Sequence, residues 1–172
     1  MPSLAFNLMS YMFKLRDLLR PRDEILKEAE IEPGFRVLDY GCGPGGYVGG
    51  AAGLVGESGK VYALDLHPLA LRRVRELARK RELANVETIH SDCQTGLPDD
   101  SINVILLYDI FHMLSRPQDI LAELHRVSSP DGTLSFMDPH MSEDEIVSGV
   151  TSGRLFRLSS RGTHTYRFEP VA

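Results

Sequence analysis

A run of glycines and an acid that follows it are the residues of this chain best suited to bind a ligand. The run contains Gly41, Gly43, Gly45 and Gly46, and Asp65 ends the next strand-like segment. Glycine has no Cβ, so the backbone can turn tightly and approach a ligand closely. A carboxylate about 20 residues after such a loop can accept hydrogen bonds from both hydroxyls of a ribose. The spacing therefore predicts a nucleoside-containing cofactor.

The residue before the glycines helps to choose between two cofactor classes. Gly41, Gly43 and Gly46 fit the spacing G-x-G-x-x-G of dinucleotide-binding loops, which bring amide groups and a helix N-terminus to a pyrophosphate. Asp39 stands directly before this loop, however, and a carboxylate there would repel a phosphate. The acid favours a ligand that carries an amino group or a sulfonium.

Alternating strands and helices are expected to position these residues. Alternation of this kind indicates an α/β fold with a mainly parallel sheet, in which ligands bind at the carboxyl ends of the strands. Asp39, Asp65, Asp92, Asp109 and Asp138 lie at or near the five expected ends. We expect strands at 35–39, 60–65, 85–90, 102–108 and 133–138, helices at 47–55, 68–81 and 117–127, a turn at 129–132, a capped helix from Ser142, and a final antiparallel hairpin with strands 154–159 and 163–169 around Arg161-Gly162.

The first part of the chain reads as helical. Apolar residues recur at helical spacing over residues 3–31, Pro21 interrupts the pattern, and 22–29 forms a second helix. We expect residues 1–31 to form a helical cap on a core of residues 34–172, within a single domain of residues 1–172. The cluster of Lys14, Arg16, Arg20 and Arg22 leaves a membrane-surface helix as an alternative.

Composition limits the possible partners. The 172 residues carry a formal net charge of -5, which argues against a nucleic-acid partner. Cys42 and Cys93 are far apart and have no metal-ligand spacing, so we expect neither a disulfide nor a metal site, and a reducing cytoplasm. The apolar stretch at residues 4–13 is too short to span a membrane.

Five motifs follow one another along the chain. They are Val37-Leu38-Asp39-Tyr40-Gly41-Cys42-Gly43-Pro44-Gly45, Val61-Tyr62-Ala63-Leu64-Asp65-Leu66, Ser91-Asp92-Cys93 with Leu97-Pro98, Asn103 to His112 with Leu114, and Ser129-Pro130-Asp131-Gly132-Thr133-Leu134. In this order they resemble the motifs of class I S-adenosylmethionine-dependent methyltransferases, and the compact small-molecule type, including enzymes of quinone biosynthesis, is the most similar. The resemblance covers roughly residues 20–170 and implies a Rossmann-like three-layer sandwich, whose seven-stranded, mainly parallel sheet ends in a C-terminal antiparallel hairpin.

This resemblance implies S-adenosylmethionine as cofactor and S-adenosylhomocysteine as product. By the family pattern, the glycine loop approaches the methionine part, and Asp39 orients the loop and reaches the amino group. Asp65 holds the ribose hydroxyls, while Asp92 contacts the adenine amino group. The implied cofactor-binding residues are Asp39, Gly41, Cys42, Gly43, Gly45, Asp65, Leu66 (packing on adenine), Asp92, Cys93 (through its backbone amide) and Tyr108 (through its carbonyl).

Catalytic residues are harder to choose, because methyl transfer mainly requires alignment and needs a base only for some acceptors. His112, His140 and Asp109 are the candidates, since they lie near expected strand ends, and Asp138 and Tyr11 are further ones. Each also has a structural alternative, such as packing beside the cofactor or capping a helix. The four other histidines (His67, His90, His125 and His164) are expected to be structural or exposed.

The acceptor is expected to be a small molecule. The chain leaves little room for insertions beside the site, so the N-terminal helices or a second subunit of a homodimer would complete the pocket, unless a large substrate covers it. The sequence Tyr108-Asp109-Ile110-Phe111 stands where enzymes that methylate base nitrogens carry Asn-Pro-Pro-Tyr, which argues against that activity. An NAD(P)-dependent oxidoreductase and a non-catalytic S-adenosylmethionine-binding protein remain as alternatives.

Overall fold

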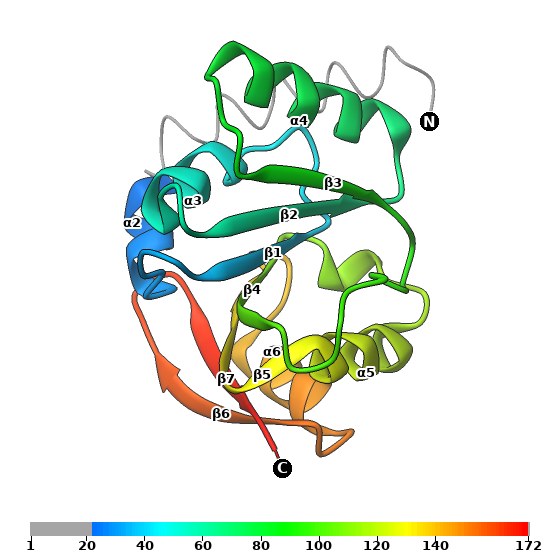
Figure 1. The fold of residues 1–172 in the computed structure, drawn as a ribbon. Helices are drawn as coiled ribbons and strands as arrows, with labels where there is room; N and C mark the ends of the chain where they lie inside the picture. Colours follow the sequence, from blue (N-terminus) through cyan, green and yellow to red (C-terminus); the bar gives the residue numbers. More distant parts are fainter. Residues whose placement is uncertain (1–21, 172) are drawn as a thin grey trace.

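The computed structural model describes residues 22–171, in which helices and strands alternate along the chain (Figure 1). The first expected helix lies outside these residues, as do Tyr11 and three members of the basic cluster, Lys14, Arg16 and Arg20. The elements are α2 (Arg22–Glu28), β1 (Arg36–Tyr40), α3 (Val48–Val55), β2 (Lys60–Asp65), α4 (Pro68–Lys80), β3 (Val86–His90), β4 (Ile102–Tyr108), the 3-10 turn η1 (Phe111–Met113), α5 (Pro117–Val127), β5 (Ser128–Met137), α6 (Glu143–Thr151), β6 (Phe156–Arg161) and β7 (Tyr166–Pro170).

The strands form one sheet of seven in the order β3-β2-β1-β4-β5-β7-β6. The pairs β1–β2, β2–β3, β1–β4 and β4–β5 are parallel, whereas β7 runs antiparallel to both β5 and β6. The strand order therefore reverses between β1 and β4, which is the point where an open α/β sheet binds its ligand. The expected fold class is confirmed.

Helices cover both faces of the sheet, so the molecule has three layers. Residues of α2, α3 and α4, among them Leu26, Val48 and Leu71, pack with Val37 and Val61 in one buried cluster. The other cluster joins residues of α5 and α6 to the opposite face of β1, β4 and β5. Because both faces are buried, β4 reads as a nearly continuous apolar run, Ile102-Asn103-Val104-Ile105-Leu106-Leu107-Tyr108.

Two expected boundaries are wrong, and each has a physical cause. The turn expected at 129–132 lies within β5, because Ile102 pairs with Ser128 and Val104 with Thr133, so the intervening residues bulge out of the ladder. The final hairpin lies later in the chain than expected, since its strands are 156–161 and 166–170 and its turn lies at 162–165 rather than around Arg161-Gly162. There the Glu28 carboxylate accepts backbone N–H groups that a longer ladder would use.

Two expectations about helices are confirmed. The helix expected at 22–29 is α2. Ser142 and Glu145 form a reciprocal capping box at the start of α6. Both cysteines are free thiols. Over residues 22–171, no helix has the length and apolar character that crossing a membrane would require.

Candidate active site

The glycine loop between β1 and α3 has a backbone shape that requires glycine. Gly41, Gly43 and Gly45 have φ angles of 73°, 52° and 85°, in the left-handed region that side chains disfavour. A Cβ on Gly41 would also lie 2.9 Å from a side-chain carbon of Ile110. Thus the loop both turns sharply and leaves its backbone open toward the carboxyl ends of β1 and β4.

Asp65 at the end of β2 is tied to this loop. Its Oδ2 accepts a hydrogen bond of 2.9 Å from the Gly43 N–H, and its Oδ1 accepts one of 2.7 Å from the His67 N–H. These bonds fix the carboxylate beside the loop, where its remaining lone pairs can accept hydroxyl protons. Leu66 follows, and 66% of its surface is exposed. An exposed apolar side chain at this edge of the sheet can pack against a flat ring of a ligand.

A pocket of about 230 Å³ opens between these residues and the turn after β4. Asp65 and Leu66 line one side, Met113 and Arg116 line the other, and Asp92 completes it. The Arg116 guanidinium donates to an Asp92 carboxylate oxygen at 3.3 Å across the rim. An apolar slot with a carboxylate at each end suits a nucleoside.

A smaller pocket of about 60 Å³ lies next to the first, on the other side of the glycine loop. Asp39, Tyr47, Tyr108, Asp109 and Arg22 line it. The Asp39 side chain is buried, and its Oδ2 has no hydrogen-bond partner among the described residues. Burial and, to a lesser extent, the neighbouring Asp65 charge raise the pKa of Asp39 to about 7, although Arg22 opposes this shift. A buried carboxylate of this kind fits a ligand that brings a cationic amino group.

Arg22 is a site residue that sequence reasoning missed. Its guanidinium carbon lies 5.5 Å from the centre of the Tyr47 ring, and a Cβ on Gly46 would collide with the guanidinium. A cation and the Asp39 carboxylate therefore line the same small pocket. That arrangement matches the two charged ends of an amino acid.

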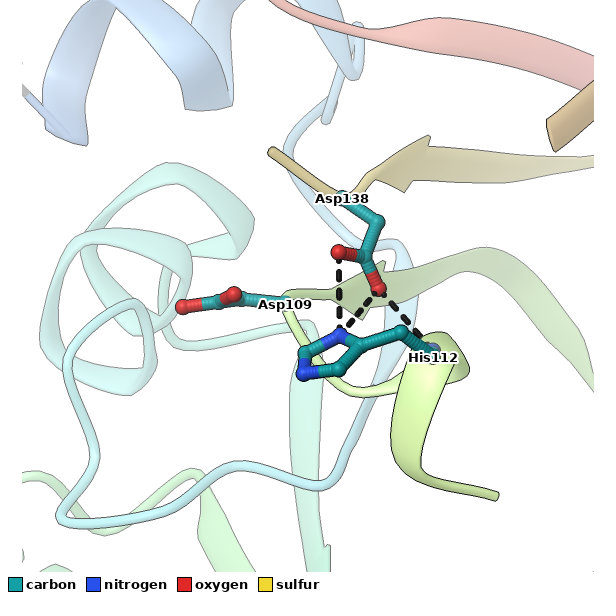
Figure 2. Close-up of side chains that lie close together, drawn as sticks. All are labelled: Asp109, His112 and Asp138. Atoms are coloured by element: carbon teal, nitrogen blue, oxygen red, sulfur yellow. Dashed lines mark hydrogen bonds and ion pairs between the residues drawn. The ribbon is translucent and has the colours of Figure 1, made fainter. Parts of the chain in front are cut away.

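His112 and Asp138 form a hydrogen-bonded pair where β4 and β5 end (Figure 2). His112 Nδ1 lies 2.8 Å from Asp138 Oδ2 and 3.0 Å from Oδ1, and the His112 N–H donates to Oδ2 at 3.1 Å. The Asp138 side chain is fully buried, whereas 27% of the His112 side chain is exposed. With Nδ1–H donated to the carboxylate, Nε2 is left as a proton acceptor.

Asp109 and His140 lie beside this pair. His140 Nε2 is 3.5 Å from Asp109 Oδ1, and the ring centres of His112 and His140 are 4.5 Å apart. Asp109 has a φ of 56°, a costly conformation that is common at functional sites. The structure thus brings together the three catalytic candidates, His112, His140 and Asp109, with Asp138.

The side chains of this cluster are also of types that bind metal ions, a possibility that the sequence pattern did not indicate. Ligand atoms of Asp109, His112 and Asp138 all lie within 4.8 Å of one another. Mixed imidazole and carboxylate donors suit a divalent transition metal. However, both Asp138 oxygens already contact His112 Nδ1, so the contacts on hand are those of a proton-transfer pair.

The other three residues expected to bind the cofactor, Cys42, Cys93 and Tyr108, have buried side chains. Cys42 is buried in the loop, and burial raises the pKa of its thiol well above the usual range. Cys93 is also buried, and its N–H donates to Ser91 Oγ at 3.2 Å. The Tyr108 hydroxyl pairs with Ser135 Oγ at 2.7 Å.

The four other histidines have structural contacts, as expected. His67 Nδ1 accepts from the Leu69 N–H at the start of α4. His90 and His125 bond the carbonyls of Leu66 and Val171, and His164 faces Glu24.

Comparison with known proteins identifies the family to which the chain belongs. A family model described as "Methyltransferase domain" matches residues 31–160. The chain belongs to this methyltransferase family. It is 30% identical to a SAM dependent methyltransferase from Aquifex aeolicus, with a TM-score of 0.78, 92% of this chain covered and 94% of that one. A coclaurine N-methyltransferase bound to N-methylheliamine and SAH is 27% identical, with a TM-score of 0.60, and the match covers 66% of this chain and 33% of that one.

Curated relatives include a demethylmenaquinone methyltransferase from Geobacillus kaustophilus. It is 28% identical over 131 residues, which are 76% of this chain and 56% of that protein. The methyltransferase chain therefore spans about half the length of the curated relatives it matches. The comparisons support S-adenosylmethionine as the cofactor, as the acid before the glycine loop indicated, and give no support to the oxidoreductase alternative.

Proposed function

We propose that this chain transfers the sulfonium methyl group of S-adenosylmethionine to a small aromatic acceptor that carries a hydroxyl group, such as a phenol or hydroquinone. The observation that carries the proposal is the His112–Asp138 pair at the ends of β4 and β5. A base beside the cofactor site is useful where the acceptor must lose a proton to become nucleophilic.

The pair is built for that proton transfer. The buried Asp138 carboxylate receives Nδ1–H of His112 at 2.8 Å, which fixes the tautomer and stabilises the imidazolium that forms. Nε2 of His112 then takes the acceptor's hydroxyl proton. The resulting phenolate is nucleophilic at oxygen and at the adjacent ring carbons. His140 and Asp109, 3.5 Å apart beside the pair, would contact and orient the acceptor.

The two pockets have the donors and acceptors that S-adenosylmethionine needs. In the larger one, Asp65 would accept the ribose hydroxyls, Leu66 would pack on adenine, and Asp92 would bond its edge. The Cys93 amide would join Asp92 by exchanging its hydrogen bond to Ser91 Oγ for one to the ring. When bound, the cofactor supplies a methyl group already activated by positive sulfur.

In the smaller pocket, the backbone of Gly41 and Gly43 would approach the methionine part. Asp39 and the Tyr108 carbonyl would bind the amino group, and Arg22 would bind the carboxylate. The orphaned Asp39 oxygen is the feature that best supports this fit.

Three finer points are part of the proposal. A quinol acceptor agrees with the names of the curated relatives, which are demethylmenaquinone methyltransferases. A cytoplasmic location suits two free buried cysteines. A second copy of the chain in a homodimer would complete the acceptor side of the site.

The test is turnover of S-adenosylmethionine with a panel of hydroquinones, phenols, amines and thiols. We expect methylation of a hydroxyl-bearing aromatic, and His112→Gln should lower kcat by roughly 10²- to 10⁴-fold, the usual value of a general base. The affinity for S-adenosylhomocysteine should not change, because His112 lies outside both cofactor pockets.

His125→Gln serves as the matched control, since His125 hydrogen-bonds the Val171 carbonyl, packs on Phe156 and lines neither pocket. Full activity in His112→Gln would refute the base role. Turnover of amines or thiols alone would refute the acceptor class.

A further inference from the structure

The short helix α2 connects the cofactor site to the C-terminal hairpin. Arg22, at its first position, lines the smaller pocket, and Glu28, at its last position, lies against the turn between β6 and β7. Six residues of α-helix span about 9 Å. One rigid element therefore has a cofactor-facing end and a hairpin-facing end.

Glu28 binds the whole hairpin turn with one carboxylate. The backbone N–H groups of Thr163, His164 and Thr165 donate to it at 3.0, 3.0 and 2.8 Å, and the Thr165 hydroxyl adds a bond of 2.9 Å. Burial alone would raise the pKa of Glu28, but these hydrogen bonds outweigh burial and lower it. The carboxylate is thus held charged and fully used.

Further contacts join α2 and the residues after it to the hairpin. Arg167 of β7 forms an ion pair with Glu30, just after α2, and His164 Nε2 lies 3.9 Å from a Glu24 carboxylate oxygen. A Cβ on Gly162 would collide with the Glu28 carboxylate, so the turn fits closely around it. The turn between β6 and β7 therefore holds the C-terminal end of α2 in place.

The middle of α2 packs against α3, and its first residue, Arg22, reaches the glycine loop. Ile25 and Leu26 are buried in the core, and a Cβ on Gly50 of α3 would lie 2.6 Å from a Leu26 methyl carbon. Arg22 then reaches over Tyr47 beside the loop. A displacement of α2 at Glu28 would consequently move the Arg22 guanidinium.

We propose that Glu28 is a positioning residue for cofactor binding. By anchoring α2 in the hairpin turn, it sets the position of Arg22 and so the affinity for S-adenosylmethionine. The inference rests on the role proposed above for Arg22 at the methionine carboxylate. It assigns to the β6–β7 hairpin a function beyond closing the sheet.

The physical reason is that α2 has little stability of its own. A helix of seven residues is too short to persist without tertiary contacts. Without the carboxylate, three backbone donors of the turn lose their acceptor, which costs more than a single hydrogen bond gains. The helix end and the turn would then separate.

A double-mutant cycle tests the coupling. We measure the Kd for S-adenosylhomocysteine by titration calorimetry in the wild type, Glu28→Gln, Arg22→Ala and the double variant. Arg22→Ala should weaken binding roughly tenfold, as expected for one charged hydrogen-bond partner. Glu28→Gln should weaken it by about three- to tenfold, and the double variant should bind no more weakly than Arg22→Ala alone. At saturating cofactor, kcat of Glu28→Gln should stay near that of the wild type.

Glu143→Gln is the matched control. Glu143 of α6 pairs with Arg161 of β6, so its loss removes a contact of the hairpin that does not involve α2. Its affinity for S-adenosylhomocysteine should equal that of the wild type. If Glu28→Gln does not fold, Thr165→Val removes only the hydroxyl donor to Glu28 and should weaken binding to a smaller degree.

The outcomes separate this inference from the proposed function. Wild-type affinity in a folded Glu28→Gln, or in Thr165→Val where that variant replaces it, overturns the inference, as does equal weakening with and without Arg22. Wild-type affinity in Arg22→Ala overturns the role of Arg22 and the inference with it. Failure of the wild type to bind S-adenosylhomocysteine would instead refute the methyltransferase function itself.

Discussion

Asp39 is the residue whose ionisation most directly reports on the cofactor site. Burial and the Asp65 charge raise its pKa to about 7, so the free protein binds a proton there that the unfolded chain has lost above pH 4. Between these values the folded state holds more protons than the unfolded state, and stability falls as the pH rises. Above pH 7 the full cost of a buried charge is present. Asp39 thus favours binding at the expense of stability.

This ionisation predicts proton release on binding. A cationic amino group beside Asp39 lowers its pKa, so near pH 6.5 the carboxyl, mostly protonated in the free protein, should release up to one proton. Calorimetric titration with S-adenosylhomocysteine in buffers of different ionisation enthalpy measures this number. Release should vanish above about pH 8, where Asp39 is already charged, and in Asp39→Asn. Proton uptake on binding would contradict the assignment.

Sequence reasoning found some site residues because their positions follow from local pattern. Asp39 and Asp65 end strands beside a glycine loop, and parallel strands bring such ends to one edge. The His112–Asp138 pairing depends on the left-handed backbone at Asp109 and a single 3-10 turn, which no periodicity signals. Arg22 was missed because α2 is placed by contacts such as that between Glu28 and Thr165, 137 residues apart.

Helix α5 holds the loop after β3, which carries Asp92. Its buried Glu123 accepts from the N–H and hydroxyl of Thr95 at 2.8 and 2.6 Å, and from Arg126 at 2.7 Å. Arg126 in turn donates to the Leu97 carbonyl and to Asp99. The loop after β3 is therefore fastened to α5 by charged hydrogen bonds, which fixes Asp92 beside the pocket.

Removing the hydrogen bonds of Glu123 should lower the stability of the fold by an amount that depends on pH. The hydrogen bonds from Arg126, followed by those from Thr95, lower the pKa of Glu123 from 4.5 to about 2, despite burial. A lowered pKa adds stability above about pH 4.5 that is lost as the pH falls toward 2. Glu123→Gln should therefore lower the free energy of unfolding by about 2–3 kcal/mol at pH 7.

Urea denaturation at pH 7 and pH 3 measures this effect. The difference between Glu123→Gln and the wild type should shrink at the lower pH. Glu76→Gln, on the exposed side of α4, controls for the loss of a surface charge. A difference that stays constant with pH would show that packing, not ionisation, sets the cost.

The presence of most helices and strands could be predicted from the periodicity of apolar residues. The residues at which these elements begin and end were predicted less accurately. The strands β2 and β4 and the helix α5 have the expected bounds, because apolar runs and prolines mark them. The hairpin shifted because Glu28, far away in the sequence, competes for the N–H groups of its turn. A prediction based on residues that are neighbours in the sequence cannot include a contact with a residue as distant as Glu28.

At the scale of the whole molecule, binding should stabilise the fold cooperatively. The cofactor pockets draw residues from the ends of β1, β2 and β4, from α2 and from the turns before α5, so a ligand there contacts several elements together. A ligand that binds only the folded state adds about 2.7 kcal/mol at 100 times its Kd. For a chain of this size each kcal/mol raises Tm by roughly 2–4 °C.

S-adenosylhomocysteine at that concentration should therefore raise Tm by roughly 5–11 °C in a thermal unfolding scan. NAD at the same concentration should leave Tm unchanged, because its pyrophosphate would lie against the buried Asp39 and the tied Asp65. Asp65→Ala should remove most of the shift at this fixed concentration, since the ribose loses its acceptor and the Gly43 N–H loses its partner. A shift with NAD equal to that with S-adenosylhomocysteine would mean that the acids at the ends of β1 and β2 do not select the cofactor. An undiminished shift in Asp65→Ala would mean that the glycine loop alone does so.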